Sequence, residues 1–119
     1  MENILKDNPK ASIRVFAVWE PILPTDVTRP ISIVLNRLSD SRVSQVWDKR
    51  HILATRMAAD ARPPQPAHEC CVRNNHLWDL VAFYPADVKW ESQMPTALVF
   101  DGPVVRIEDQ VRKALASTN

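Results

Sequence analysis

Residues 94–106, with the sequence MPTALVFDGPVVR, decide the expected fold of the chain. An apolar run follows Pro95, reaches Asp101-Gly102 and continues as a second apolar run. Asp-Gly between two apolar runs predicts a β-hairpin, because glycine adopts positive φ without steric cost. Gly102 is also the only glycine in the chain, which indicates a position where no side chain fits.

The composition is that of an ordinary globular domain. The chain has 119 residues, enough for one domain with a real core, and it is 45% hydrophobic and 24% charged. The net charge is +1 without a long run of one sign, so neither nucleic acid nor a membrane surface is an expected partner. No apolar stretch approaches the ~20 residues that span a bilayer.

The N-terminal residues 1–10 lack the apolar core of a signal peptide, and the first residues of a domain are often poorly ordered. We therefore expect a flexible N-terminal arm over 1–10, a single domain over 11–119 and a cytoplasmic location.

Hydrophobic spacing along the chain predicts alternating strands and helices. The expected elements, in order, are a strand at 11–19, a proline-bearing loop at 20–30, a helix at 28–38, a strand at 43–47, a helix at 48–60 that Asp48 caps, a proline-rich connection at 61–67, a loop at 68–76, a strand at 77–84, the hairpin at 94–106 and a helix at 107–116. The first two strands should run parallel because a helix joins them. The fold class expected is α/β, with a mixed sheet covered by helices on both faces.

The C-terminal part of this order resembles the thioredoxin-like superfamily. The resemblance rests on Pro95-Thr96, an apolar run that ends in Phe100, a glycine turn, a pair of valines and a closing amphipathic helix. It implies a thioredoxin-like fold in which the strand at 77–84 is an insertion before the Met94-Pro95 turn. It also implies a cis peptide bond before Pro95, with backbone beside it that pairs with an extended thiol substrate.

The chain departs from the redox motif of this superfamily, in which Trp-Cys-x-x-Cys stands at a helix N-terminus that stabilises a thiolate. The matching stretch, 18–24, has the sequence VWEPILP, so Trp19 is present and both cysteines are absent. An ordinary dithiol oxidoreductase that works from this position is excluded. Glu20 stands near one missing thiol, and it is either an acid or base in a cleft or a solvated carboxylate at a strand end.

Cys70 and Cys71 are the only cysteines of the chain, and they are adjacent. They cannot join distant segments, but they could close a vicinal disulfide. They could also bind a soft ion such as arsenite, mercury or copper(I), or act as nucleophile and resolving thiol. In the simplest alternative, one cysteine is a small buried apolar residue and the other has no functional role. His68 and His76 complete four potential zinc ligands, but adjacent cysteines lack the usual zinc spacing, so no zinc site is predicted.

We therefore expect an atypical thioredoxin-like protein that handles thiols or soft metal ions through Cys70 and Cys71. Trp19, Glu20 and Met94-Pro95 are the expected binding residues. The expected partner is a protein or a small thiol, and no cofactor is implied. If the protein is an enzyme, the resemblance implies a thiol-disulfide oxidoreductase.

The alternative is a thioredoxin-fold binding or scaffold module without catalysis. Its cleft would be formed by Glu20, Pro21 and the Met94-Pro95 backbone, and it would hold an extended peptide by strand pairing. The sequence leaves the oligomeric state open, since an exposed edge at 77–84 could pair with that of a second chain in a homodimer.

Overall fold

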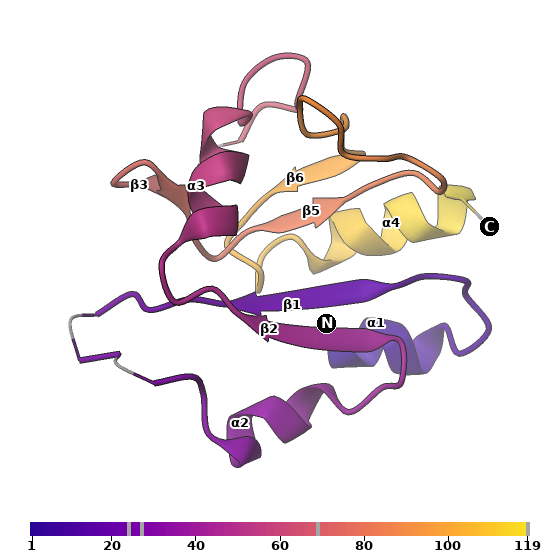
Figure 1. The fold of residues 1–119 in the computed structure, drawn as a ribbon. Helices are drawn as coiled ribbons and strands as arrows, with labels where there is room; N and C mark the ends of the chain where they lie inside the picture. The colour runs from indigo at the N-terminus through magenta and orange to yellow at the C-terminus, as the bar shows by residue number, and fades with distance from the viewer. Residues whose placement is uncertain (24, 27, 69, 119) are drawn as a thin grey trace. The chain divides into compact units, whose positions relative to one another are not determined.

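The computed structural model of the chain describes residues 1–23, 25–26, 28–68 and 70–118 (Figure 1). Pro24 and Val27 of the expected loop at 20–30, Glu69 of the expected loop at 68–76, and Asn119 lie outside the described residues. The chain divides into two compact units, residues 1–52 and 53–119. The single domain expected over 11–119 stays a prediction.

The first unit is built on a two-stranded parallel sheet. Strand β1 (Val15–Trp19) pairs along its whole length with β2 (Val43–Trp47), whose bounds are those predicted from the sequence. Between them lie helix α2 (Ser32–Leu35) and the 3-10 turn η1 (Asn36–Leu38). The strand-helix-strand order and the parallel pairing are thus confirmed. The helix begins later than expected because Ile31, directly after a proline, is extended with ψ 160°.

Residues 1–10, for which a flexible arm is expected, contain a helix, α1 (Glu2–Asp7). Its residues Ile4 and Leu5 are only 2% and 1% exposed. Arg42 holds the C-terminal end of this helix, where the last carbonyl groups have no partner within the helix. Its guanidinium donates to the backbone oxygens of Leu5 and Asn8, each at 2.8 Å.

Asp40 orients the Arg42 guanidinium. Its carboxylate accepts two hydrogen bonds from the guanidinium, at 2.9 and 2.7 Å, and a third from the backbone N–H of Arg42. These hydrogen bonds from Arg42 lower the pKa of Asp40 to about 2. The pair therefore fixes α1 to the start of β2.

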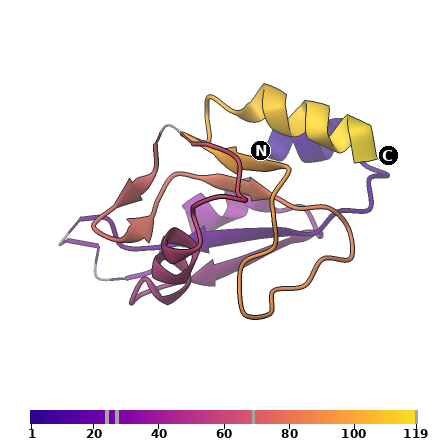
Figure 2. The ribbon, with the colours of Figure 1, turned by 90° about the horizontal axis from the view of Figure 1, so that it is seen from above.

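The second unit holds the remaining elements. They are α3 (Ile52–Ala59), which crosses from the first unit, β3 (Val72–Arg73), β4 (His76–Leu77), β5 (Val81–Phe83), β6 (Val99–Asp101) and α4 (Glu108–Thr118). The expected cap of α3 is confirmed, since the Asp48 carboxylate accepts from the Ile52 N–H at 2.7 Å. Helix α4 lies beside β6 (Figure 2).

The core of the second unit gathers around Phe100, which is 1% exposed. Leu77, Met94 and Ala97 belong to the same buried cluster. The apolar stripe predicted for the closing helix is buried as well, at Val111 and Leu115 together with the preceding Ile107.

The expected hairpin at 94–106 is only half correct. Val99–Asp101 is a strand, but its antiparallel partner is β5, and residues 104–106 form a turn. Pro103 has no N–H to donate to a sheet. The next N–H, of Val104, donates to the Asp79 carboxylate at 3.0 Å instead.

The strand expected at 77–84 is divided into β4 and β5, because Asp79 between them has a φ of 51°. The described residues therefore form three two-stranded sheets, and the single mixed sheet is a wrong expectation. The cis peptide bonds of the described residues are Pro63-Pro64 and Gly102-Pro103, so the expectation of a cis bond at Met94-Pro95 is also wrong. A mixed α/β class holds, and none of the described helices is long and apolar enough to cross a membrane.

The Arg42–Asp40 pair generates a prediction about acid stability. Asp40 titrates in the folded protein well below its ordinary pKa of about 3.9. Its contribution to stability is therefore complete above about pH 4 and is lost as the pH falls through about 2. Arg42→Ala should return the Asp40 titration to about pH 4 and accelerate amide exchange at the end of α1, as measured by NMR.

Arg14→Ala is the matched control, because Arg14 is exposed and lies one residue before β1. A wild-type Asp40 that titrates near pH 4, or an α1 that exchanges equally slowly in both variants, would contradict this role of Arg42.

Candidate functional site

Cys70 and Cys71 are bonded to each other through their sulfurs, with Cα atoms 3.7 Å apart. Cys71 is buried, at 6% exposure, whereas Cys70 is partly exposed. Cys71 also has a φ of 84°, a region that costs a residue with a side chain on the order of 1–2 kcal/mol. Its carbonyl accepts from the Trp78 N–H at 3.0 Å. The two cysteines therefore differ in exposure, and the hydrogen bond from Trp78 holds the backbone of the buried one.

The buried sulfur lies in a tight contact with Asp79 and Gly102. The Cys71 Sγ is 3.4 Å from the carbonyl oxygen of Asp79. A Cβ added at Gly102 would overlap that same oxygen and lie 2.7 Å from the sulfur. Gly102 does not have a positive φ, so the expected reason for a glycine here was wrong. The glycine is required because the chain passes too close to the disulfide for any side chain.

A short hairpin follows the cysteines directly. Strands β3 and β4 pair antiparallel across Asn74 and Asn75, whose φ values are 51° and 63°. Two central residues with positive φ make the turn that best suits a two-residue hairpin, and asparagine tolerates this conformation. The loop expected at 68–76 thus contains a hairpin, which the Asn-Asn pair could have predicted. The Arg73 guanidinium of this hairpin lies over the Trp78 ring, 5.7 Å from the ring centre.

The two histidines near the cysteines make other contacts. The His68 ring meets the Phe100 ring edge-on, with centroids 5.5 Å apart. The His76 Nδ1 lies 3.2 Å from the carbonyl oxygen of Asn74. His68 thus ties the segment before the cysteines to the buried core.

Met94 and Pro95 are held by side chains from the segment after α3. The Asp60 carboxylate accepts from the Met94 N–H at 2.9 Å. The amide of Gln65, 7% exposed, donates to the carbonyl oxygens of Met94 and Pro95 and accepts from the Ala97 N–H. An extended peptide at this position would have to displace Gln65 and Asp60.

A hollow of about 230 Å³ lies along this proline-rich segment. Its lining residues are Ala61, Arg62, Pro63, Gln65, Pro66, Ala67 and His68. The Gln65 side chain, which bonds to the backbone of Met94, Pro95 and Ala97, forms part of the wall of this hollow. The shape of the hollow therefore depends on that side chain.

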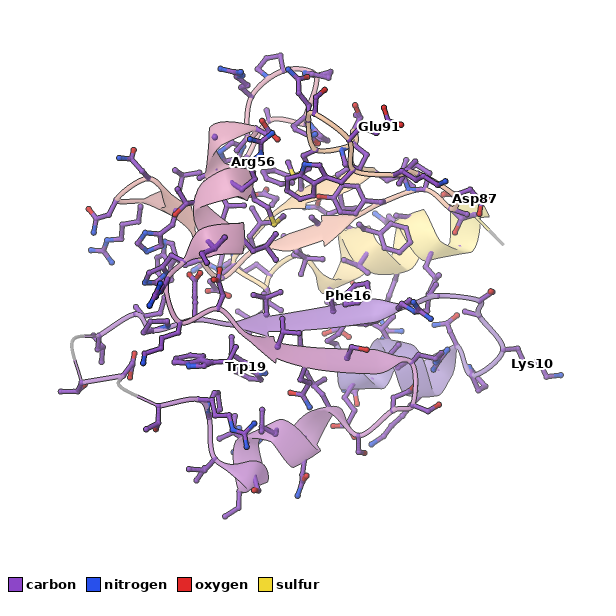
Figure 3. The ribbon with its side chains drawn as sticks, in the orientation of Figure 1. Lys10, Phe16, Trp19, Arg56, Asp87 and Glu91 are labelled. Atoms are coloured by element: carbon purple, nitrogen blue, oxygen red, sulfur yellow. A yellow bond between two sulfur atoms is a disulfide. The ribbon has the colours of Figure 1, made fainter. Side chains whose placement is uncertain are left out.

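Trp19 is the last residue of β1 in the first unit (Figure 3), and Glu20 follows it directly in the chain. The Trp19 indole donates to the Gln45 side chain at 2.9 Å. The Glu20 side chain is 10% exposed, and its Oε2 lies 3.4 Å from the His51 Nδ1, an ion pair when the imidazole is protonated. Glu20 is therefore a largely buried partner of His51, and the alternative of a solvated carboxylate is wrong.

Gly102→Ala should destabilise the protein, because the added methyl meets both a backbone oxygen and the Cys71 sulfur. We expect a loss of roughly 1–3 kcal/mol in urea unfolding. Cys71→Ala should recover part of that loss, because the sulfur contact is then absent while the overlap with Asp79 remains. Ser92→Ala, an exposed change in the same unit, is the control. Full stability of Gly102→Ala would rule out this close approach.

Gln65→Ala removes three hydrogen bonds to buried or partly buried backbone groups. At about 1 kcal/mol for each bond, we expect a loss of roughly 2–4 kcal/mol in unfolding free energy. Gln93→Ala is the matched control, since Gln93 is exposed one residue before Met94. Equal stability of the two variants would show that Gln65 does not hold this turn.

No protein-family model, no curated protein and no solved structure matches the chain. The candidate site is accordingly defined by its own geometry, in which a bonded pair of adjacent cysteines has one buried residue, Cys71, and one partly exposed residue, Cys70.

Proposed function

We propose that the protein handles thiols through a reversible disulfide between Cys70 and Cys71, as an atypical member of the thioredoxin-like class that its sequence resembles. The observation that carries the proposal is the bonded pair itself, in which Cys71 is enclosed and Cys70 is partly exposed. This difference gives the two sulfurs different roles in thiol-disulfide exchange, because access to the sulfur limits the rate of attack.

The proposed reaction begins with the reduced pair and an oxidised partner that contains a disulfide. The Cys70 thiolate attacks one partner sulfur, forms a mixed disulfide and releases the first partner thiol. The Cys71 thiolate then attacks the Cys70 sulfur, releases the second partner thiol and closes the vicinal disulfide. Two electrons pass from the protein to the partner, and the reverse sequence oxidises a partner dithiol.

The surroundings of Cys71 support its role as the resolving thiol. Its sulfur lies against Gly102 and the Asp79 carbonyl, which leaves little room for a partner sulfur on that side. The same carbonyl can accept the S–H of the reduced cysteine at the observed 3.4 Å. An incoming disulfide therefore reaches Cys70 first.

The binding-module alternative has less support. It requires free backbone beside Pro95 for strand pairing, and the N–H and carbonyl groups of Met94 already bond to Asp60 and Gln65. Disulfide exchange, in contrast, requires no free backbone groups. It requires only the sulfurs of Cys70 and Cys71, which are bonded to each other.

The count of free thiols in the native protein tests the proposal. After alkylation without reductant, the intact mass should show an unmodified chain that is lighter by two hydrogens. After mild reduction, both cysteines should be alkylated in the folded protein, and removal of reductant should restore the disulfide. Thiols that react only after unfolding would overturn the proposal and favour a binding module.

The order of the two sulfurs generates a second prediction. Cys71→Ser should accumulate a mixed disulfide at Cys70 when treated with glutathione disulfide, because the resolving thiol is missing. Cys70→Ser is the matched variant, and its adduct should form at least roughly tenfold more slowly because Cys71 is enclosed. Equal rates in the two variants, followed by mass spectrometry, would contradict the assigned roles.

A further inference from the structure

We infer that the reduced Cys70–Cys71 pair is a chelating site for monosubstituted trivalent arsenicals, compounds in which arsenic carries one organic group and two exchangeable positions. The inference rests on the proposed function only in that it uses the same reduced pair. It adds a ligand class and a binding geometry that disulfide exchange does not require.

The number of sulfurs selects this class among soft ligands. Thiolates prefer soft centres, and both cysteines of the chain lie at this one site. Inorganic arsenite has three exchangeable positions, so the pair would leave one of them without sulfur. A monosubstituted arsenical has two such positions, and the pair satisfies both.

The spacing of the two sulfurs selects the geometry. The Cα atoms are 3.7 Å apart, and the two sulfurs are bonded to each other in the oxidised form, so both side chains reach the same side of the chain. Trivalent arsenic is pyramidal and accepts two sulfurs on one side of the atom. Mercury(II) with two thiolates is linear and needs them on opposite sides, which adjacent residues do not provide. The pair therefore favours the pyramidal centre.

The walls of the site determine the direction of entry. Gly102 and the Asp79 carbonyl enclose the Cys71 sulfur. The ligand must enter beside the more exposed Cys70, and its organic group must point toward solvent on that side. A bulky substituent is compatible with this arrangement, whereas a ligand that needs a third protein sulfur is not.

The reaction balances without an oxidant or a reductant. An arsenoxide R–As=O meets two S–H groups, two As–S bonds form, and the oxygen leaves as one water molecule with both protons. Arsenic remains trivalent throughout. The disulfide form of the protein has no S–H group to offer, so it does not react.

The test uses phenylarsine oxide with the reduced 119-residue chain, observed by intact mass in excess monothiol. We expect one adduct per chain, protection of both cysteines from alkylation, and release by ethanedithiol. Two linked sulfurs should bind on the order of 10²-fold more tightly than one. Cys70→Ser and Cys71→Ser should therefore each lose the adduct in the monothiol wash. Methylmercury, with one exchangeable position, is the control ligand and should not require both cysteines.

The oxidised wild-type protein provides a second comparison that needs no variant, and it should remain free of adduct. Retention of phenylarsine oxide by either single variant, by the oxidised protein, or by none of the proteins would overturn the inference. The thiol count after reoxidation separates the two proposals. A reversible disulfide without a retained arsenical leaves disulfide exchange intact, and a retained arsenical without a reversible disulfide leaves only the chelating site.

Discussion

The close approach of Gly102 to the Cys71 sulfur and the Asp79 carbonyl is the contact on which the candidate site depends. It brings the end of β6 against a disulfide more than thirty positions earlier in the sequence. The fixed chain on both sides maintains a Cys71 backbone that a side chain ordinarily disfavours. Cys71 is buried while Cys70 is partly exposed, and the proposed chemistry rests on this difference between the two cysteines.

Side-chain bonds to the backbone hold the surroundings of this contact. The Asp79 carboxylate accepts a hydrogen bond from the N–H of Val104, the residue after Pro103. Gln65 donates to the Met94 carbonyl and so joins the proline-rich segment to the turn at Met94. Such bonds are needed because these segments lack the continuous sheet that would otherwise satisfy their backbone groups. The site is therefore positioned mainly by loops that particular polar residues fix.

The sequence predicted the local elements better than the contacts between them. The parallel pairing of β1 with β2 and the apolar stripe of α4 follow from hydrophobic spacing, which acts over a few residues. The steric need for Gly102 was also predictable, because a chain with one glycine should place it where a side chain is excluded. The Asn74-Asn75 turn also has a local signal, because asparagine tolerates the positive φ that both residues adopt, although only a loop was expected there. Two other contacts were not predictable from the sequence. Arg42 bonds to the end of α1 and Gln65 bonds to the backbone at Pro95, and each contact joins residues about thirty or more positions apart.

The most direct test of the account is an equilibrium titration of the folded protein in glutathione redox mixtures, with the state of Cys70 and Cys71 measured by intact mass. We expect one reversible two-electron step in the wild type, and a displaced midpoint in Gly102→Ala because the added methyl group displaces the Cys71 sulfur. A pair that stays fully oxidised or fully reduced across all mixtures, and changes only when the protein unfolds, would contradict the account.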